Sequence, residues 1–388
     1  MAGVPVSACP HCGAEIHESD AFCEACGGDL VGAVEPAAAL APAGDPDVHH
    51  APFTAGTSIL NAPQQQRTAA CGYCGGAINI DGFCENCGAK APTRRDHWTE
   101  SPAAWVGAVC DRGIRHARNE DALATMATES LAGNGFAVLV VCDGVTSAPD
   151  SDQASLAAAI EARDHLMAAV RVSEQSPIPV GAAAIEASVR WMTAACRVAQ
   201  VAVIGVTERI RAAAAQRGPV TGSVEPPSCT FVAAVVQPHR LITAWCGDSR
   251  AYWLPDDGEA VQLSTDHSLA SELIAQGMTR ELAEQSPTAH TITRWLGIDS
   301  PTPQPDTATT DLDRPGWVLL CSDGMWNYAT GAVELAGLVS QAIADGATSP
   351  TTIAESLAAF ANDQGGHDNI TVALARVEGT SSTPPEEA

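Results

Sequence analysis

Residues 137–147 read "AVLVVCDGVTS", an apolar run that ends on Asp143 and Gly144. Residues 317–324, "WVLLCSDG", repeat this arrangement with Asp323. A short apolar run bounded by a turn pair is typical of a buried strand. Because Asp-Gly is a common turn pair, one copy alone indicates only a strand followed by a turn. Two copies require a comparison with the rest of the chain.

Similar apolar runs mark the other strands of the chain. We predict strands at 105–110, 136–142, 229–236, 241–246, 251–254, 317–321 and 370–377. Helical spacing with many alanines predicts helices at 153–171, 180–217, 268–276, 332–345 and 350–362. Strands in neighbouring pairs, with helices between the groups, predict an α+β fold in which antiparallel sheets pack together and are flanked by helices.

Length and charge restrict the class of protein. The chain has 388 residues, more than one typical domain, and 46% of them are hydrophobic, enough for a sizeable core. Its net charge of −26 would repel nucleic acid and anionic membranes, so neither is expected as a partner. The sequence contains no apolar run of transmembrane length and no signal-peptide pattern. We therefore expect a cytoplasmic protein whose cysteines are reduced or bind metal.

Eight of the 14 cysteines form Cys-x-x-Cys pairs before residue 90. They are Cys9, Cys12, Cys23, Cys26, Cys71, Cys74, Cys84 and Cys87. Two such turns facing each other supply four thiolates to one tetrahedral zinc ion, and a glycine after each second cysteine permits a positive φ. "FCEACG" and "FCENCG" nearly repeat, which indicates a duplication. A thioredoxin-like redox pair occurs singly, so the tandem copies favour two zinc ribbons, each with a structural zinc ion.

Composition divides the chain into segments. Ala, Pro and Gly without periodicity are typical of a flexible linker, and a ribbon is too short to bury a core without metal. We expect zinc ribbons at 1–30 and 69–90, linkers at 31–68 and 91–100, a larger domain at 101–378 and a disordered tail at 379–388.

Aspartates recur where the predicted strands end or turn. They occur in "NED" at 119–121, "CDG" at 142–144, "CGDSR" at 246–250, "CSDG" at 321–324 and "GGHDN" at 365–369. If several carboxylates converge at one edge of the sheets, their mutual repulsion requires a cation. Carboxylate, carbonyl and water ligands select Mg²⁺ or Mn²⁺. The Asp-Gly pairs therefore predict metal ligands at strand ends.

Residues 101–378 resemble the metal-dependent serine/threonine protein phosphatases of type 2C. The resemblance rests on motifs in the family's order: "CDRGIRHARNED" (110–121), "VVCDG" (140–144), "SCTFVAAVV" (228–236), "WCGDSRAYWL" (245–254), "STDHSLASELIAQG" (264–277), "TITRWLG" (291–297), "LLCSDGMWNY" (319–328) and "GGHDNITV" (365–372). It implies a four-layer α-β-β-α sandwich with metals at one end of the sheets, here preceded by the two small zinc ribbons.

The resemblance also implies the metal ligands and the reaction. Asp143 would bridge two Mn²⁺ or Mg²⁺ ions, with the Gly144 carbonyl on one ion and Asp323 and Asp368 on the other. These three aspartates would be the catalytic residues. A water bridging two divalent cations loses its proton near neutral pH, and the resulting hydroxide attacks phosphorus while the ions offset the developing charge. No covalent enzyme intermediate is needed.

Three further acidic residues receive roles from the resemblance. Glu120 and Asp121 would hold water molecules bound to the ions, and Asp248, together with Asp323, would bind a weaker third ion. The chain departs from the family pattern after its first metal motif, which continues as "DGVTSAPDS" rather than with further glycines. Some relatives have a histidine proton donor after that glycine, and Val145 stands there instead.

The phosphate-binding arginine of the family falls on His116, with Arg115 and Arg118 beside it. An arginine would provide a permanent charge and two donors, whereas a histidine provides one donor and a charge that depends on pH. We predict His116 and Arg115 as phosphate-binding residues. The alternative is that His116 only flanks the site and that Arg115 or Arg118 binds the phosphate.

These features favour a protein phosphatase that acts on phosphorylated serine and threonine and opposes a protein kinase. The zinc ribbons would serve as protein-docking modules. The alternative is a catalytically weak protein that binds phosphoproteins as a scaffold through an altered site. A nucleic-acid-binding zinc protein is excluded by charge, because the ribbons contain hardly any basic residues.

Overall fold

The computed structural model describes residues 6–8, 15–17 and most of 70–378. Within the last range it leaves out 71–73, 81, 89–90, 92, 132–134, 147, 175–181, 218–224 and 287. The chain divides into two compact units, Met1–Thr68 and Ala69–Ala388.

The first unit contains one short antiparallel pair of strands. Strand β1 (Val6–Ala8) pairs with β2 (Glu15–His17), with Val6 opposite His17. In the sequence these strands precede and follow Cys9 and Cys12, which lie outside the described residues.

The second unit contains a six-stranded sheet in which every neighbouring pair is antiparallel. Its strands in spatial order are β10 (Val261–Gln262), β9 (Arg250–Pro255), β12 (Gly316–Cys321), β13 (Ile370–Val377), β4 (Val106–Asp111) and β3 (His97–Ala103). Strand β13 comes last in the sequence but lies in the interior of the sheet.

The same unit contains a five-stranded antiparallel sheet. Its strands in spatial order are β11 (Asp306–Asp311), β8 (Arg240–Cys246), β7 (Phe231–Gln237), β6 (Ala137–Cys142) and β5 (Ala122–Ala127). Every strand predicted from the sequence is an interior strand of one of the two sheets. The outer strands β3, β5, β10 and β11 were not predicted from the sequence.

The stretch "AVLVVC" forms β6, and all of its residues are buried. Alternate side chains of a strand point to opposite faces, so the run divides between two cores. Val138, Val140 and Cys142 belong to the core beneath the long helices, whereas Leu139 and Val141 belong to the core between the two sheets. Strand β12 is divided in the same way between the inter-sheet core and a third core beneath α6 and α7. Burial on both faces explains why these strands contain no polar residue before the aspartate.

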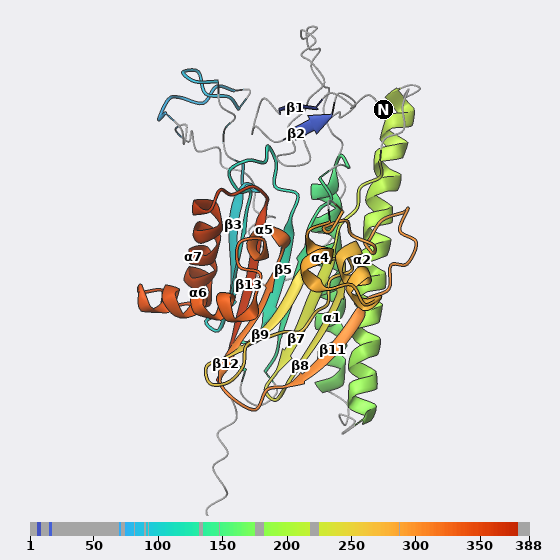
Figure 1. Cartoon of the computed structure of the whole chain (residues 1–388), viewed down its shortest axis with the longest axis vertical. Coiled ribbons are helices and arrows are strands. Elements are labelled where there is room, and N and C mark those ends of the chain that lie inside the picture. Colours follow the sequence, from blue (N-terminus) through green and yellow to red (C-terminus); the bar gives the residue numbers. More distant parts are fainter. Residues whose placement is uncertain are drawn as a thin grey trace, which may run out of the picture. The chain divides into compact units, whose positions relative to one another are not determined.

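Helices α1 (Ser151–Glu174) and α2 (Ala182–Arg217) pack on each other and on the outer face of the five-stranded sheet (Figure 1). By length and composition Ile185–Gln216 could also cross a membrane, and 33% of its most apolar window is buried in the domain. Because Met192 and Cys196 of this helix are fully part of the domain core, we interpret α2 as a core helix.

Helices α6 (Ala332–Ala344) and α7 (Pro350–Asp363) cover the six-stranded sheet on its other face (Figure 1). The short helix α5 (Asp323–Trp326) follows β12 directly. Helices α3 (Leu269–Ala275) and α4 (Arg280–Glu284) lie between β10 and β11 in the sequence.

The prediction of two antiparallel sheets packed together and flanked by helices is confirmed. The start of the larger domain differs from the expected boundary at residue 101, because β3 begins at His97. Strand β3 pairs with β4 from the His97–Asp111 position onward, so residues assigned to a linker belong to the sheet.

Candidate active site

Asp143 follows the last residue of β6, and Thr230 holds its backbone. The Asp143 N–H donates to Thr230 Oγ1 at 3.0 Å, and the Thr230 N–H donates to the Asp143 carbonyl at 2.7 Å. The Thr230 hydroxyl lies 2.7 Å from the Ser249 hydroxyl. A Cβ at Gly144 would lie 2.5 Å from the Glu120 carbonyl oxygen, so only glycine fits there. These contacts fix the position at which Asp143 leaves the sheet.

Four other carboxyl groups converge on Asp143. Burial raises the pKa of Asp143 well above its usual range, and the charges of Asp121, Asp323, Asp368 and Asp248 raise it further. Burial also raises the pKa of Asp323 well above its usual range, and the next largest contribution comes from Asp368. Asp143 also influences both neighbours, because its side chain lowers the pKa of Asp121 and of Asp323 against the dominant effect of burial. The structure thus brings together the aspartates of all five motifs.

Asp121 joins the ends of the two sheets. Its side chain is only 1% exposed, and its Oδ2 accepts hydrogen bonds of 2.7 Å from the hydroxyls of both Ser322 and Thr371. Burial raises the pKa of Asp121 to about 6, although the two hydroxyl donors oppose the shift. Asp121 directly precedes β5, whereas Ser322 directly follows β12 and Thr371 lies in β13 of the six-stranded sheet, so this carboxylate links the two sheets at the site.

Asn369 organises the neighbouring loop, and the sequence analysis missed it. Its Oδ1 accepts the Glu120 N–H at 2.7 Å, and its Nδ2 donates to the carbonyls of Arg112 and Arg118 at 2.8 and 3.0 Å. A Cβ at Gly324 would lie 2.0 Å from the Asn369 carbonyl, so the segment after β12 packs directly on this residue. The available signal was its place in "GGHDN", a polar residue directly before a buried strand.

Asp248, the residue predicted to bind a third ion, is 7% exposed. Burial raises its pKa to about 7, with a further contribution from Asp266. The Trp326 indole N–H donates to the Asp248 carbonyl at 3.0 Å, and the Arg250 guanidinium lies 3.6 Å from the centre of the Trp326 ring. Arg250 in turn donates to both oxygens of Asp266 at 2.9 and 2.7 Å. A stacked and hydrogen-bonded network therefore sets the backbone position of Asp248.

The residues predicted to bind phosphate differ in what they contact. His116 Nε2 lies 3.3 Å from Asp368 Oδ1, and the His116 side chain is 11% exposed. Arg118 donates to Glu120 Oε1 at 2.7 Å. Arg115 is exposed, and no side chain in the described part of the protein pairs with it. Arg115 is therefore the member of this group whose charge remains available to an anion.

The donors of this cluster fit hard divalent cations. The five aspartates and the Gly144 carbonyl offer only oxygen atoms, the ligands that Mg²⁺ and Mn²⁺ prefer. Carboxylates that raise each other's pKa at one buried place are stabilised when a cation binds between them. Glu120 adjoins the cluster at 2% exposure, and burial raises its pKa as well.

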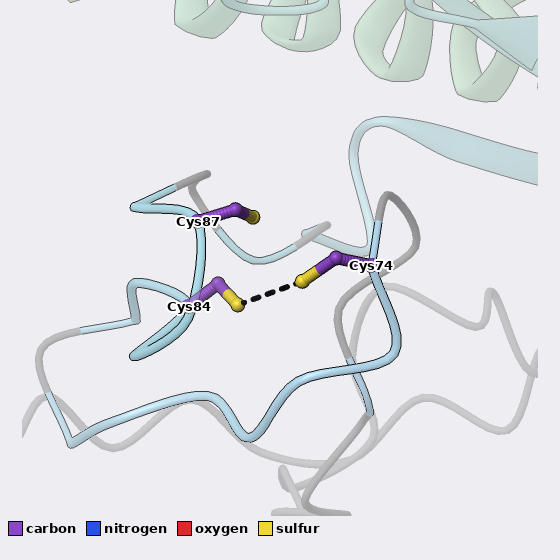
Figure 2. Close-up of side chains that lie close together, drawn as sticks. All are labelled: Cys74, Cys84 and Cys87. Atoms are coloured by element: carbon purple, nitrogen blue, oxygen red, sulfur yellow. Dashed lines mark hydrogen bonds between the residues drawn. The ribbon is translucent and has the colours of Figure 1, made fainter.

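A second group of metal-binding side chains lies near the start of the second unit. The thiols of Cys74, Cys84 and Cys87 lie within 4.8 Å of one another, and those of Cys74 and Cys84 are 3.4 Å apart (Figure 2). The remaining predicted zinc ligands lie outside the described residues. They are Cys9, Cys12, Cys23, Cys26 and Cys71.

The backbone around these thiols has the predicted geometry. Gly75 and Gly88, which each follow a second cysteine, have φ angles of 70° and 74°. A Cβ at Gly76 would lie 2.9 Å from the Cys84 sulfur, so the chain passes close to it. A side-chain hydrogen bond from Asn86, aided by the backbone of Gly76, lowers the pKa of Cys74 to about 6. Thiolate is the form that binds zinc.

Comparisons with known proteins identify the family of the chain. Residues 114–332, more than half of the chain, match the sequence profile of the family described as protein phosphatase 2C. The chain is similar to the protein phosphatase PhpP of Streptococcus pneumoniae, with 39% identity over 140 residues, 35% of this chain and 52% of that protein. It is also similar to the serine/threonine phosphatase stp of Listeria innocua, with 35% identity over 149 residues, 37% of this chain and 55% of that protein.

The chain thus spans about half the length of the curated relatives it matches. Among solved structures, the serine/threonine phosphatase Stp1 from Staphylococcus aureus matches 71% of this chain and 95% of its own, with 24% identity and a TM-score of 0.53. A bacterial serine phosphatase matches with 23% identity and a TM-score of 0.52, over 71% of this chain and 98% of its own. These structures share the fold, and the sequence profile shows that the chain belongs to the protein phosphatase 2C family.

Proposed function

We propose that this protein is a metal-dependent phosphatase that removes phosphate from phosphoserine and phosphothreonine in proteins. The observation that carries the proposal is the convergence of Asp143, Asp323 and Asp368 at one end of the two sheets. The helices on both outer faces fit the four-layer α-β-β-α order expected of the family. The substrates would be phosphorylated proteins, and the enzyme would oppose a bacterial serine/threonine kinase.

Asp143 would lie between two Mn²⁺ or Mg²⁺ ions, with the Gly144 carbonyl and the carboxylates of Asp323 and Asp368 as further ligands. When bound, such ions supply a water of low pKa as nucleophile and offset the charge that develops on the phosphoryl oxygens. Glu120 and Asp121 would orient water molecules at the ions. Asp248 would hold the weaker third ion.

Arg115 and His116 would bind the substrate phosphate together. Arg115 supplies a permanent charge without a competing carboxylate among the described residues. His116 would supply one donor, and its contact with Asp368 keeps it beside a proposed metal ligand. Arg118 is less suited, because Glu120 already accepts its hydrogen bond at 2.7 Å.

The cysteine cluster supports a zinc ribbon over residues 69–90, with Cys71 as the fourth ligand beside Cys74, Cys84 and Cys87. Four thiolates complete the tetrahedral coordination of a structural zinc ion. The duplicated sequence supports a second ribbon over residues 1–30. Both ribbons would serve as protein-docking modules of a cytoplasmic enzyme.

The test starts from protein freed of divalent cations by EDTA. Addition of Mn²⁺ should restore hydrolysis of p-nitrophenyl phosphate and release of phosphate from a phosphothreonine peptide, and further chelation should abolish both. For substitutions of the clustered aspartates by asparagine, Asp313→Asn is a matched control, because Asp313 is exposed and pairs with Arg314. Retention of the phosphopeptide without phosphate release at saturating Mn²⁺ would favour the alternative, a catalytically weak phosphoprotein-binding protein.

A further inference from the structure

The loop between β4 and β5, residues 112–121, contains most of the residues proposed to bind phosphate and to orient water. It has no helix or strand of its own. Asn369 holds the loop from the side of β13, as described above. Gly366 holds it as well, since its carbonyl accepts the Ile114 and Arg115 N–H groups at 2.9 and 3.0 Å, and the Ser155 hydroxyl donates to the Glu120 carbonyl at 2.5 Å. Further contacts come from residues 93–96, which connect the cysteine cluster to β3.

Arg95 forms hydrogen bonds with the end of this loop. Its Nη2 donates to the Asp121 carbonyl at 2.9 Å and to the Asn119 carbonyl at 3.2 Å. The Asn119 side chain donates back to the Arg95 carbonyl at 2.9 Å. The exchange is reciprocal, so the Arg95 backbone and the backbone of Asn119–Asp121 are fixed against each other at the position of Glu120.

Asp96 contacts the start of the same loop. Its carbonyl accepts the Arg112 N–H at 2.7 Å, and its Oδ1 lies 3.6 Å from Arg112 Nε. Arg112 Nη1 donates to the His116 carbonyl, which extends the contact to the predicted phosphate-binding residue. Thr93 fixes the Asp96 side chain, since its N–H donates to Oδ2 at 2.7 Å and its hydroxyl to Oδ1 at 3.1 Å.

The Arg95 guanidinium lacks some of its hydrogen bonds, which reduces the stability of the fold. Its Nε and Nη1 are buried with no protein hydrogen-bond partner, although it lies 5.2 Å from the centre of the Trp98 ring. A buried donor without a partner is destabilising, so a position that retains one calls for an explanation. Positioning of the loop provides that explanation, because the hydrogen bonds that the guanidinium does make, from Nη2, go to the Asn119 and Asp121 carbonyls.

We infer that Arg95 and Asp96 are positioning residues for the phosphatase reaction, a role that rests on the proposed function. They lie before the first of the phosphatase motifs, which begins at Cys110, yet they contact both ends of the loop that presents His116, Glu120 and Asp121. Arg95 acts through the backbone carbonyls and does not touch the carboxylates. Loss of its side chain should loosen Asn119–Asp121, while the contacts from Asn369, Ser155, Ser322 and Thr371 remain.

The segment that carries this contact is tied to the cysteine cluster. The Gly88 N–H donates to the Cys84 carbonyl at 2.9 Å, and the Ala91 N–H donates to the Gly82 carbonyl at 2.6 Å. Residues 93–96 therefore leave the cluster from a fixed point. An occupied zinc site would restrict where Arg95 can reach.

The experiment uses full-length protein with Arg95→Met, which keeps the aliphatic stem and removes the donors. Its matched control is Arg94→Met, because Arg94 is exposed and no described residue pairs with its side chain. In metal-free protein, hydrogen exchange of the Glu120 and Asp121 amides should accelerate roughly tenfold in Arg95→Met and stay unchanged in the control. The Mn²⁺ concentration for half-maximal turnover should rise roughly fivefold or more in Arg95→Met alone.

Arg95→Lys should restore part of the protection, because an ammonium can reach one carbonyl but lacks the planar fork. If Arg95→Met loses protection across both sheets, Arg95→Lys becomes the deciding variant. Wild-type exchange at Glu120 and Asp121 in a folded Arg95→Met protein would overturn the inference. Hydrogen exchange requires no turnover, so an inactive wild-type protein would refute the proposed function and still leave this inference tested.

Discussion

The two groups of metal-binding side chains are built in opposite ways. The aspartates stand at the ends of buried strands, where Thr230, Asn369 and the hydroxyls around Asp121 hold the backbone and the carboxylate. The three described cysteines stand on tight turns, and among them only Cys84 is buried, at 3% exposure.

The aspartates are held by a scaffold that folds without metal, whereas the cysteine segment needs metal in order to fold. The aspartate cluster is destabilised by its own charge, and the large cores of two sheets hold it together regardless. The cysteine segment has little apolar area to bury, so metal binding has to supply most of its folding free energy. Substitutions should therefore affect activity alone at the first cluster and local folding at the second.

Asp323→Asn is expected to have the largest effect and tests the first half of this comparison. Turnover of a phosphothreonine peptide at saturating Mn²⁺ should fall roughly 10³-fold or more, because two-metal chemistry tolerates no missing ligand. The metal-free variant should melt at the wild-type temperature or above it, since one of several repelling carboxylates is gone. Asp143→Asn and Asp368→Asn should behave alike. Wild-type turnover in Asp323→Asn would show that the metal assignment is wrong.

Cys84→Ser tests the second half. Zinc content by elemental analysis should fall by one ion per chain from an expected two, because one ribbon loses a ligand. Amide protection should disappear at Asn79 and Glu85, whose N–H groups bond the Phe83 and Ala77 carbonyls, while the two sheets keep theirs. Unchanged zinc content would contradict the ribbon, and loss of protection throughout the sheets would contradict the independence of the two clusters.

His116→Ala tests whether the His116 imidazole binds the substrate phosphate. KM for a phosphopeptide should rise roughly tenfold if the imidazole binds the phosphate, with kcat changed less. Arg115→Ala is the companion variant, and His116→Arg should keep the KM at the wild-type value or lower it, because a guanidinium supplies two donors and a permanent charge. Wild-type KM in His116→Ala together with an increased KM in Arg115→Ala would assign the phosphate to the arginine alone.

The smallest expected effect concerns the outer strand of the scaffold. His97 Nδ1 lies 2.6 Å from Asp111 Oδ2, and this hydrogen bond raises the pKa of His97 from 6.5. Burial alone would raise the pKa of Asp111, but hydrogen bonds from His97, Asn362 and Gly113 bring it below 3.8. The pair therefore contributes stability above about pH 4, which is lost as the pH rises through the raised pKa of His97.

Urea denaturation of wild type and His97→Gln at pH 6 and pH 9 measures this contribution. Because His97 is half exposed, its loss should cost less than about 1 kcal/mol at pH 6 and close to nothing at pH 9. An equal cost at both pH values would mean that packing of His97, and not its charge, supports β3.

Much of the fold follows from the sequence because interior strands must be apolar on both faces. Runs such as "AVLVVC" in β6 can be recognised as strands from the sequence. In contrast, "HWTESPA" in β3 and "DTATTD" in β11 contain polar residues, which an outer strand tolerates. The aspartates were found because each lies close to the beginning or the end of an apolar run. Asn369 and Arg95 could not be found in this way, because they form hydrogen bonds with backbone carbonyls and amides that lie far away in the sequence.

The place of β13 sets the order in which the protein can be assembled on the ribosome. This strand contains the last described strand residues of the chain, yet it pairs with β4 and β12 in the interior of the six-stranded sheet. Until it emerges, β4 and β12 have no common neighbour, and Asp368 has not arrived at the cluster. Pairing over such sequence separation is slow, so the nascent chain stays without a catalytic centre until residues 368–377 have left the ribosome.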